Sequence, residues 1–277
     1  MLEQGKHVEL NILKRAVFGL YLTDDSGEEV LLPNKYCTEE MKPGGKVIVF
    51  IYRDSEGRTV ATTLTPKINL HEFALLKVSE VTAVGAFLDW GLEKDLMVPF
   101  REQKQKMEEG RWYIVYLDLD QKTDRLFASN RVERYLQNDE LLVKEGDEVD
   151  LVVQQKTDLG YVVIINHKHK GLIFDNEVFK EVRVGDKLKG YVKNIRDDNK
   201  IDVSLQAIGY RGANDANSEL ILTKLKEYDG FIALTDKSTP EDISTQFGIS
   251  KKAFKKALGA LYKQRLIEIQ PTGIRLL

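Results

Sequence analysis

The chain has 277 residues, 42% of them hydrophobic and 31% charged, which is an ordinary globular composition and suggests about two domains on length alone. Its single cysteine, Cys37, excludes an internal disulfide, and without a signal-peptide core or a run of transmembrane length we expect a cytoplasmic protein. The net charge of −3 discourages but does not exclude a nucleic-acid partner, because residues 210–277 carry 11 basic against 8 acidic residues.

A glycine between two β-type runs recurs three times. The glycines are Gly19, Gly85 and Gly160, spaced by 66 and 75 residues. Each repeat predicts a long strand before the glycine, a second strand after it and a short third strand. The long strands are expected at 8–18, 75–84 and 149–159, the second at 20–24, 86–90 and 161–166, and the third at 29–33, 95–99 and 170–174.

Two more strands complete each repeat. A turn that contains glycine opens the fourth strand, and a charged turn precedes the fifth. The fourth strands are expected within 42–54, 108–120 and 183–197, and the fifth at 57–63, 124–130 and 200–206. Five short strands in about 65–75 residues predict a Greek-key barrel of the OB fold. We therefore expect OB-fold domains at 1–66, 67–138 and 139–209.

After residue 209 the pattern becomes helical. The stretch "GYRGANDANS" (209–218) predicts a linker. Helices are expected at 218–228, at 238–248 with Thr239 as N-cap and Pro240 in the first turn, and at 249–265. A strand, a turn and a strand follow at 266–277. Three helices and a hairpin predict a winged helix-turn-helix domain at 218–277, so the fold class is multidomain and mainly β, with three tandem five-stranded barrels and an α+β tail.

The stretch "VGAFLDWG" (84–91) resembles the second strand of the S1 RNA-binding domain, an OB-fold module. In that family an aromatic–Gly–small–aromatic strand, a group on the third strand, and an Asp plus a basic residue around the last turn face single-stranded RNA. The first repeat matches at Phe18, Gly19 and Tyr21, with Asp54 and Arg58 around the turn.

The other two repeats match less completely. The second has Gly85 and Phe87, with Val84 at the first aromatic position and Asp120 and Arg125 around the turn. The third departs most, with Val162 at the aromatic position. Around it stand Tyr161, Phe174 on the third strand, Asp197 and Lys200. The histidine usual on the third strand of this family is missing.

The order of three such domains and a winged helix resembles the conserved virulence factor B family of bacterial RNA-binding regulators. That resemblance implies a cytoplasmic protein that binds single-stranded RNA and regulates gene expression, with a role in virulence.

The chemistry of the matched residues suits that partner. An aromatic side chain on a sheet stacks on a base for about 1–3 kcal/mol, and a nearby cation pairs with phosphate. The candidate contacts in the barrels are Phe18, Tyr21, Arg58, Phe87, Arg125, Tyr161, Phe174 and Lys200. The alternative is that one aromatic of each set packs inside its barrel. Trp90 lies three positions after Phe87, which places it on the other face of the strand and favours a core or rim role.

The stretch "NHKHKG" (166–171) contains His167 and His169. Two histidines could bind a metal ion, but no Cys or carboxylate has matching spacing. A solvated loop is therefore expected, in which Lys168 and Lys170 could contact phosphate. No metal or cofactor is predicted.

The third helix of the tail has an apolar face and a basic face. Phe254, Ala257, Leu258 and Leu261 share the apolar face at about 100° per residue. Its candidate nucleic-acid contacts are Lys252, Lys255, Lys256 and Lys263. A recognition helix in a groove and a plain solvated face both fit this pattern.

No catalytic motif emerges: the chain has no GxSxG, P-loop, HExxH or Cys/His dyad. The leading hypothesis is a non-enzymatic regulator that binds single-stranded RNA. A second hypothesis is a DNA-binding transcription regulator that uses the winged helix. A third is an adaptor associated with a ribosome or nuclease, in which the winged helix binds a protein partner.

Overall fold

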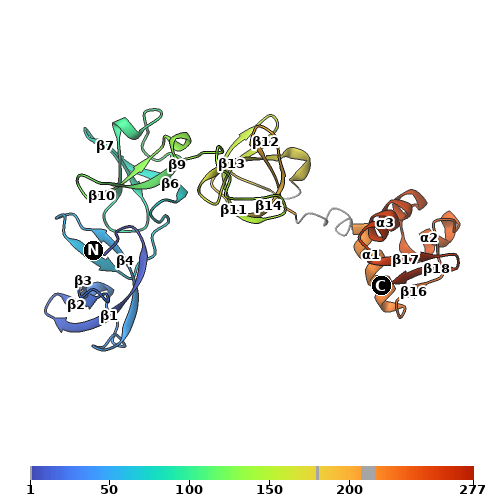
Figure 1. Ribbon diagram of the computed structural model, residues 1–277, viewed down its shortest axis with the longest axis horizontal. Helices are drawn as coiled ribbons and strands as arrows, with labels where there is room; N and C mark the ends of the chain where they lie inside the picture. The colour runs from blue at the N-terminus through green and yellow to red at the C-terminus, as the bar shows by residue number, and fades with distance from the viewer. Residues whose placement is uncertain (1, 179–180, 207–215) are drawn as a thin grey trace. The chain divides into compact units, whose positions relative to one another are not determined.

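The computed structural model describes residues 2–178, 181–206 and 216–277, with the backbone alone at positions 176 and 216. The chain divides into two units. One holds residues up to 143 with 149–189 and 195–202, and the other holds 144–148, 190–194 and the residues from 203 onward. Figure 1 shows the first sheet in blue, the second in green, the third in yellow and the C-terminal module in orange and red.

The first sheet is a closed barrel in the order β1-β2-β3-β5-β4. Its strands are β1 (His7–Ala16), β2 (Gly19–Thr23), β3 (Glu29–Pro33), β4 (Lys46–Arg53) and β5 (Thr59–Thr62), with a short helix η1 (Asn34–Tyr36) after β3. Alternate residues of β2 and β3 fill the interior: Leu20, Leu22 and Leu32 are fully buried. The alternation that predicts the strands therefore also makes the core.

The second sheet has the order β10-β9-β6-β7-β8. Its strands are β6 (Phe73–Val81), β7 (Gly85–Asp89), β8 (Leu96–Pro99), β9 (Trp112–Asp120) and β10 (Arg125–Ser129), with short helices η2 (Phe100–Glu102) and η3 (Val132–Arg134). The end strands β8 and β10 lie next to each other, but in these described residues no ladder joins them. This sheet is thus a half-barrel, whereas five closed strands were expected.

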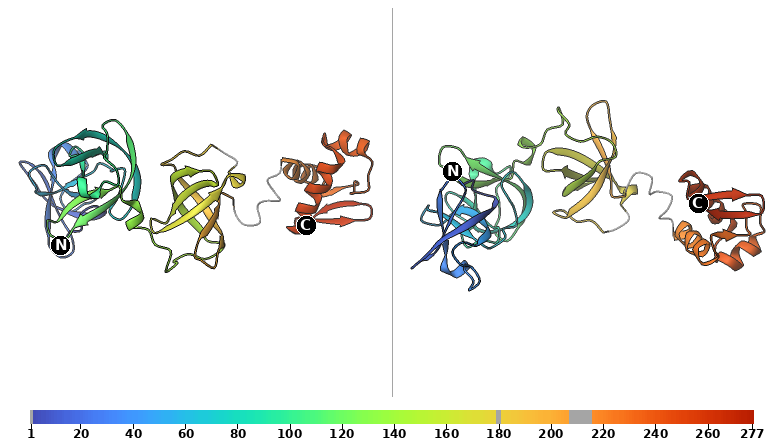
Figure 2. Two further views of the ribbon diagram at one scale, coloured as in Figure 1. Left: turned by 90° about the horizontal axis from the view of Figure 1, so that it is seen from above. Right: turned by 60° about the horizontal axis from the view of Figure 1, so that its bottom comes forward.

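The third sheet is again a closed barrel, in the order β11-β12-β13-β15-β14. Its strands are β11 (Glu148–Thr157), β12 (Gly160–Ile165), β13 (His169–Phe174), β14 (Lys187–Ile195) and β15 (Ile201–Ser204), with a short helix η4 (Asp175–Glu177). Figure 2 shows the curl of the sheets from two further sides. The predicted fold class is confirmed.

The repeated glycines open β2, β7 and β12 because the next strand passes very close to them. A Cβ atom on Gly19, Gly85 or Gly160 would lie 2.0, 2.4 or 2.0 Å from the carbonyl oxygen of Leu32, Val98 or Ile173, respectively. The preceding strand of each sheet also has a register shift, between Ile12 and Lys14, Val78 and Glu80, and Val153 and Gln155. The repeat in the sequence is therefore a repeat of a backbone crossing that only glycine permits.

The first barrel packs on the second sheet through Trp90. This indole is 3% exposed and makes edge contacts with Phe50 and Tyr52, at ring distances of 5.7 and 6.5 Å. Its Nε1 donates to the Lys94 carbonyl at 2.6 Å. Of the core or rim role expected for Trp90, the structure shows the core role. Its place at the junction explains why a polar stretch carries so large an apolar side chain.

The second sheet and the third barrel share a small apolar core and one contact made by a half-buried histidine. The shared core consists of Phe73, Ile114, Val132, Val152 and Ile164. The backbone N–H of Phe73 donates to Nδ1 of His167 at 3.0 Å, and the two rings stack.

The predicted solvated loop at 166–171 is wrong for both histidines. His169 is 0% exposed; its Nδ1 lies 2.7 Å from the Gln137 carbonyl, and its Nε2 accepts the Leu142 N–H at 3.1 Å. It therefore fastens the segment after η3 to the third barrel, and His167 fastens the second sheet. The partners are 27 to 94 positions away, which is why a local pattern suggests a loop.

Acidification is expected to weaken the contact that His167 makes. Burial lowers the pKa of His167 below its ordinary value, with Glu72 and Asp150 opposing the shift and Lys187 adding to it. As pH falls below about 6.5, His167 of the unfolded chain binds a proton before His167 of the folded chain does. The free energy of unfolding that this contact contributes is therefore complete above this pH and is lost as the pH falls further.

The measurement is thermal unfolding of wild type and His167→Asn at about pH 7.5 and about pH 5.5. Asparagine keeps a neutral acceptor and tolerates the positive φ of 57° at this position. Wild type should lose more stability on acidification than the variant. Equal losses of stability in the two proteins would show that protonation of His167 does not weaken this interface.

The C-terminal module is a winged helix. Its elements are α1 (Ala216–Glu227), β16 (Phe231–Ile232), α2 (Pro240–Phe247), α3 (Lys251–Lys263), β17 (Ile267–Gln270) and β18 (Gly273–Leu276). The strand order is β16-β18-β17, and β16 has no counterpart in the prediction. The predicted cap is confirmed: the Thr239 side chain accepts the Asp242 N–H, and proline follows it. Of the predicted linker, 209–215 lies outside the described residues, and 216–218 belongs to α1.

Candidate nucleic-acid interface

The three sheets repeat one surface, which we call the outer face. It is the side of β2, β7 and β12 that bears Tyr21, Phe87 and Val162, each two residues after the repeated glycine. These residues pair across to Leu31, Met97 and Leu172 of the next strand. The turn before each glycine adds an exposed apolar side chain: Phe18, Val84 or Leu159. The outer face thus offers apolar contact area at the same place three times.

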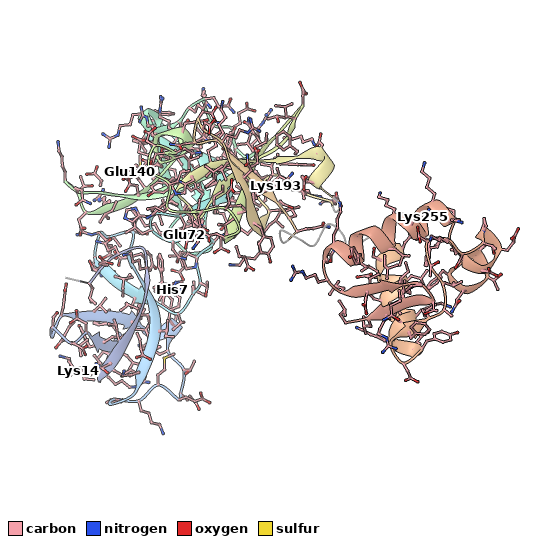
Figure 3. All side chains as sticks on the ribbon, turned by 45° about the vertical axis from the view of Figure 1, so that its right-hand side comes forward. His7, Lys14, Glu72, Glu140, Lys193 and Lys255 are labelled. Carbon is pink, nitrogen blue, oxygen red and sulfur yellow. The ribbon has the colours of Figure 1, made fainter. Side chains whose placement is uncertain are left out.

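In the first barrel both predicted aromatic side chains are available to a ligand. Phe18 lies in the turn before β2 and is 75% exposed, while Tyr21 is half-buried on β2. The ammonium of Lys14, labelled in Figure 3, lies 5.0 Å from the Tyr21 ring centroid and also pairs with Glu29 at 3.0 Å. Neither aromatic packs inside the barrel, so the alternative of a core role does not hold for this pair.

Arg58 is held by acidic neighbours. Its guanidinium pairs with Asp54 at 2.7 Å and with Glu56 at 2.9 Å. Burial acts to raise the pKa of Asp54, but the hydrogen bonds from Arg58 and from backbone N–H groups lower it overall. The pair therefore closes the turn between β4 and β5, and phosphate would have to compete with two carboxylates for Arg58.

In the second sheet the predicted residues Phe87 and Arg125 come together. Both line a groove of about 370 Å³ beside the turn of the first barrel that holds Ser55 and Gly57. Phe87 is half-buried and Arg125 is exposed. An aromatic ring beside a guanidinium is the pairing that base and phosphate contacts require.

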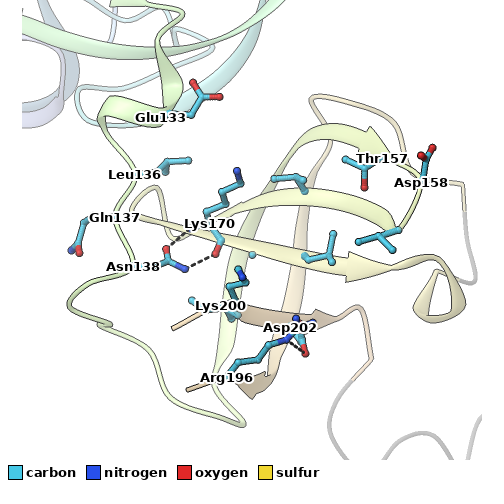
Figure 4. Close-up of a pocket in the computed structure, with 15 residues that line it drawn as sticks. Glu133, Leu136, Gln137, Asn138, Thr157, Asp158, Lys170, Arg196, Lys200 and Asp202 are labelled. Carbon is cyan, nitrogen blue, oxygen red and sulfur yellow. Dashed lines mark hydrogen bonds and ion pairs between the residues drawn. The ribbon is translucent and has the colours of Figure 1, made fainter. Parts of the chain in front are cut away.

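In the third barrel a larger groove of about 720 Å³ lies on the outer face. Figure 4 shows Lys170, Lys200 and Arg196 around it. Its apolar lining includes Leu159, Val162 and Leu172, and Leu136 from the segment after η3. Two predicted cations, Lys170 and Lys200, are therefore placed together over an apolar floor.

Two contacts of this groove could not be found from the barrel motif. Arg196 pairs with Asp202 at 2.8 Å, and its guanidinium lies 5.7 Å from the ring of Phe174, a predicted contact on β13. Asn138 forms one wall, where its side chain exchanges two hydrogen bonds with the backbone of Lys170, both of 2.9 Å. In the sequence, Asn138 is distinguished only by its position in a polar segment between two predicted domains.

The remaining predicted contacts of the third barrel are less well placed. Tyr161 alternates with Val162 and therefore lies on the other side of β12, where Lys156 covers its ring at 4.1 Å. Lys168 is exposed in the turn before β13, and its carbonyl accepts the Gln137 N–H at 3.1 Å. Lys200, which lines the groove, also pairs with Asp198 at 2.6 Å, so Asp198 takes the place in the turn that was expected for Asp197.

The winged helix presents its predicted lysines to solvent. Phe254, Ala257, Leu258 and Leu261 are buried, as the helical pattern indicates, and Lys252, Lys256 and Lys263 are exposed on α3. Lys255, labelled in Figure 3, lies 3.6 Å from Asp236. Across residues 216–277 no ion pair is recorded for Lys252, Lys256 or Lys263. These three cations can meet phosphate without breaking an internal contact.

Neither a metal-ligand cluster nor a membrane-spanning helix occurs in the part of the chain that the structure describes. No three His, Cys, Asp or Glu side chains gather there as they would around a metal ion. None of the helices in these ranges combines the length and apolarity that a bilayer crossing needs.

Comparison with known families and proteins agrees with this architecture. Residues 4–64 match the S1 domain, and residues 219–276 match the CvfB-like winged helix domain. The chain is 31% identical over 274 residues to the uncharacterized protein YitL of Bacillus subtilis, covering 94% of this chain and 89% of that one. It is 27% identical to conserved virulence factor B of Staphylococcus aureus, covering 92% and 88%.

A solved structure is also similar. It is a multidomain protein with nucleic acid binding domains from Streptococcus pneumoniae, 26% identical, with a TM-score of 0.41 and coverage of 99% of this chain and 98% of that one. The S1 and winged-helix modules together support nucleic-acid binding.

Proposed function

This chain belongs to the conserved virulence factor B family, and from that membership we propose that it binds single-stranded RNA and acts without catalysis in post-transcriptional regulation. The S1 and winged-helix modules support a binding role rather than an enzymatic one. The proposal includes a role in virulence, for which the relatives in Staphylococcus are named, and a cytoplasmic location.

The observation that carries this proposal is the groove of the third barrel. Its apolar floor fits an unstacked base, and Lys170, Lys200 and Arg196 stand where a phosphate chain would pass. The same outer face recurs on the first barrel and the second sheet, so one strand could meet several weak sites. Tethered sites raise one another's effective concentration, which compensates for the acidic charge of the barrels.

A second function is favoured by one observation. Lys252, Lys256 and Lys263 leave α3 with a basic, solvent-facing side, as in helices that enter the major groove of duplex DNA. Lysines attract the backbone of either polymer and do not read bases by themselves. We rank RNA binding first because the outer faces of three sheets support it, whereas DNA binding is supported by α3 alone.

Competition between unstructured RNA and duplex DNA of equal charge tests the choice at about 0.15 M salt. The RNA should displace a labelled RNA probe at a lower concentration than the duplex. Lys170→Gln should weaken RNA binding several-fold, whereas Lys144→Gln, an exposed lysine outside the groove, should not. Stronger displacement by the duplex would make the DNA-binding regulator the better reading.

A further inference from the structure

The groove of the second sheet is built by two modules. Phe87, Met97 and Phe127 line it from β7, β8 and β10, and all three are half-buried. The opposite wall is the β4–β5 turn of the first barrel, with Ser55 and Gly57. Neither module encloses this space alone, because the wall and the floor come from different sheets.

The junction that sets the width of this groove is firmly bonded. The carboxylate of Asp124 accepts hydrogen bonds from Arg53 and, at 2.7 Å, from the amide of Gln4. Trp90 lines the groove and packs against Tyr52 of the first barrel. The Asp54–Arg58 pair described above stiffens the turn itself. The groove therefore exists before any ligand arrives.

Positive charge gathers along its rim. Four cations line it: Arg53, Lys94, Arg101 and Arg125. They face two lining carboxylates, Asp95 and Asp120.

Ion pairs compensate two of these cations: Arg53 pairs with Asp124, and Arg101 lies 3.6 Å from Asp120. Lys94 and Arg125 are compensated less. The ammonium of Lys94 is held by the carbonyls of Arg53 and Asp54, at 3.2 and 2.8 Å. Burial first, and then the charges of Arg125 and Arg53, lower the pKa of Lys94, with Asp54 opposing them. Within the described residues, the buried Nε of Arg53 has no hydrogen-bond partner, and no ion pair is recorded for Arg125.

We propose that this groove holds one nucleotide, with its base against Phe87 and Phe127 and its phosphate toward Arg125 and Lys94, and that the first barrel completes the site. The inference rests on the proposed function, because single-stranded RNA is the expected source of the nucleotide; a free mononucleotide offers the same chemistry. A groove of about 370 Å³ is near the lower end of ligand sites, which suits one nucleotide.

The test uses Trp90 as a built-in reporter in the full-length chain. Trp112→Phe removes the only other tryptophan, an exposed side chain outside the groove. The probes are a ten-nucleotide oligoadenylate and adenosine 5′-monophosphate. Total RNA binding is measured separately, by anisotropy of a labelled oligoadenylate. We expect the oligoadenylate to change Trp90 emission saturably and Phe87→Leu to weaken that response about ten-fold.

The shared wall is tested from the first barrel. Ser55→Glu places a carboxylate on the turn that faces the phosphate and should weaken the Trp90 response roughly five-fold. Thr38→Glu adds the same charge to another exposed turn of the first barrel, outside the groove, and should leave the response unchanged.

The outcomes separate this inference from the proposed function. RNA that binds by anisotropy while Trp90 emission stays constant, or equal effects of Ser55→Glu and Thr38→Glu, would overturn the shared groove and leave RNA binding intact. No binding of labelled RNA, with a Trp90 response to the mononucleotide, would reject the RNA function and keep the groove as a nucleotide site. Absence of both signals would reject both.

Discussion

A single methyl group at position 160 is expected to disrupt the third barrel. In Gly160→Ala the new Cβ would lie 2.0 Å from the Ile173 carbonyl oxygen and 2.9 Å from the Cα of Phe174, both backbone atoms that cannot rotate away. The φ of 146° adds strain. We expect a loss of about 4 kcal/mol or more, at the high end for one substitution. Because β12 and β13 form the floor of the groove, RNA binding by this barrel should fall with it.

Gly146→Ala is the matched control in the same barrel. Gly146 also has a positive φ, 93°, but a Cβ there meets no atom within 4 Å. It should cost only about 1 kcal/mol of backbone strain. The measurement is native-state hydrogen exchange of peptides that cover β12 and β13, which reports on this barrel separately from the others. Equal loss of protection in the two variants would mean that the close approach of β13 does not require glycine.

The second large effect is expected from the winged helix. Replacing Lys252, Lys256 and Lys263 together by glutamine should flatten the dependence of log K on log salt for single-stranded RNA by about 2. Each phosphate contact on a single strand contributes about −0.7 to this slope, and three are removed. The substitutions are on the exposed face of α3, so its buried apolar face should stay packed.

Lys255→Gln is the control for this helix. Lys255 is equally exposed, but Asp236 lies 3.6 Å from its ammonium and already compensates its charge. Its slope should stay within experimental error of the wild-type value. If the triple variant keeps both affinity and slope, the lysines form a solvated face, and the winged helix is better interpreted as a protein-interaction module.

Local patterns were sufficient for the order and type of the modules. The repeated glycines, the alternation in strands such as 187–195 and the Thr239–Pro240 helix start each depend on residues close in sequence, so they could be predicted one by one. The buried face of α3 followed from helical spacing in the same way. Resemblance to the S1 domain then added the expectation of RNA.

The candidate site was predicted only in part. Phe87 with Arg125, and Lys170 with Lys200, do meet in grooves. The walls of those grooves come from elsewhere: Asn138 lies 32 positions before Lys170, and Ser55 lies 32 positions before Phe87. No short-range period connects residues so far apart.

The sequence by itself determined that this protein is a chain of β modules and a winged helix, because periodicity and capping are local and survive in any packing. Only the tertiary structure decided which of the candidate side chains lie exposed or in grooves. His169 is buried and His167 half-buried because distant backbone groups bond to their nitrogens. Tyr161 lies on the other side of its strand, and Arg58 is held by its neighbouring acids. Burial and charge compensation depend on contacts across modules, and those contacts exist only after the sheets have packed.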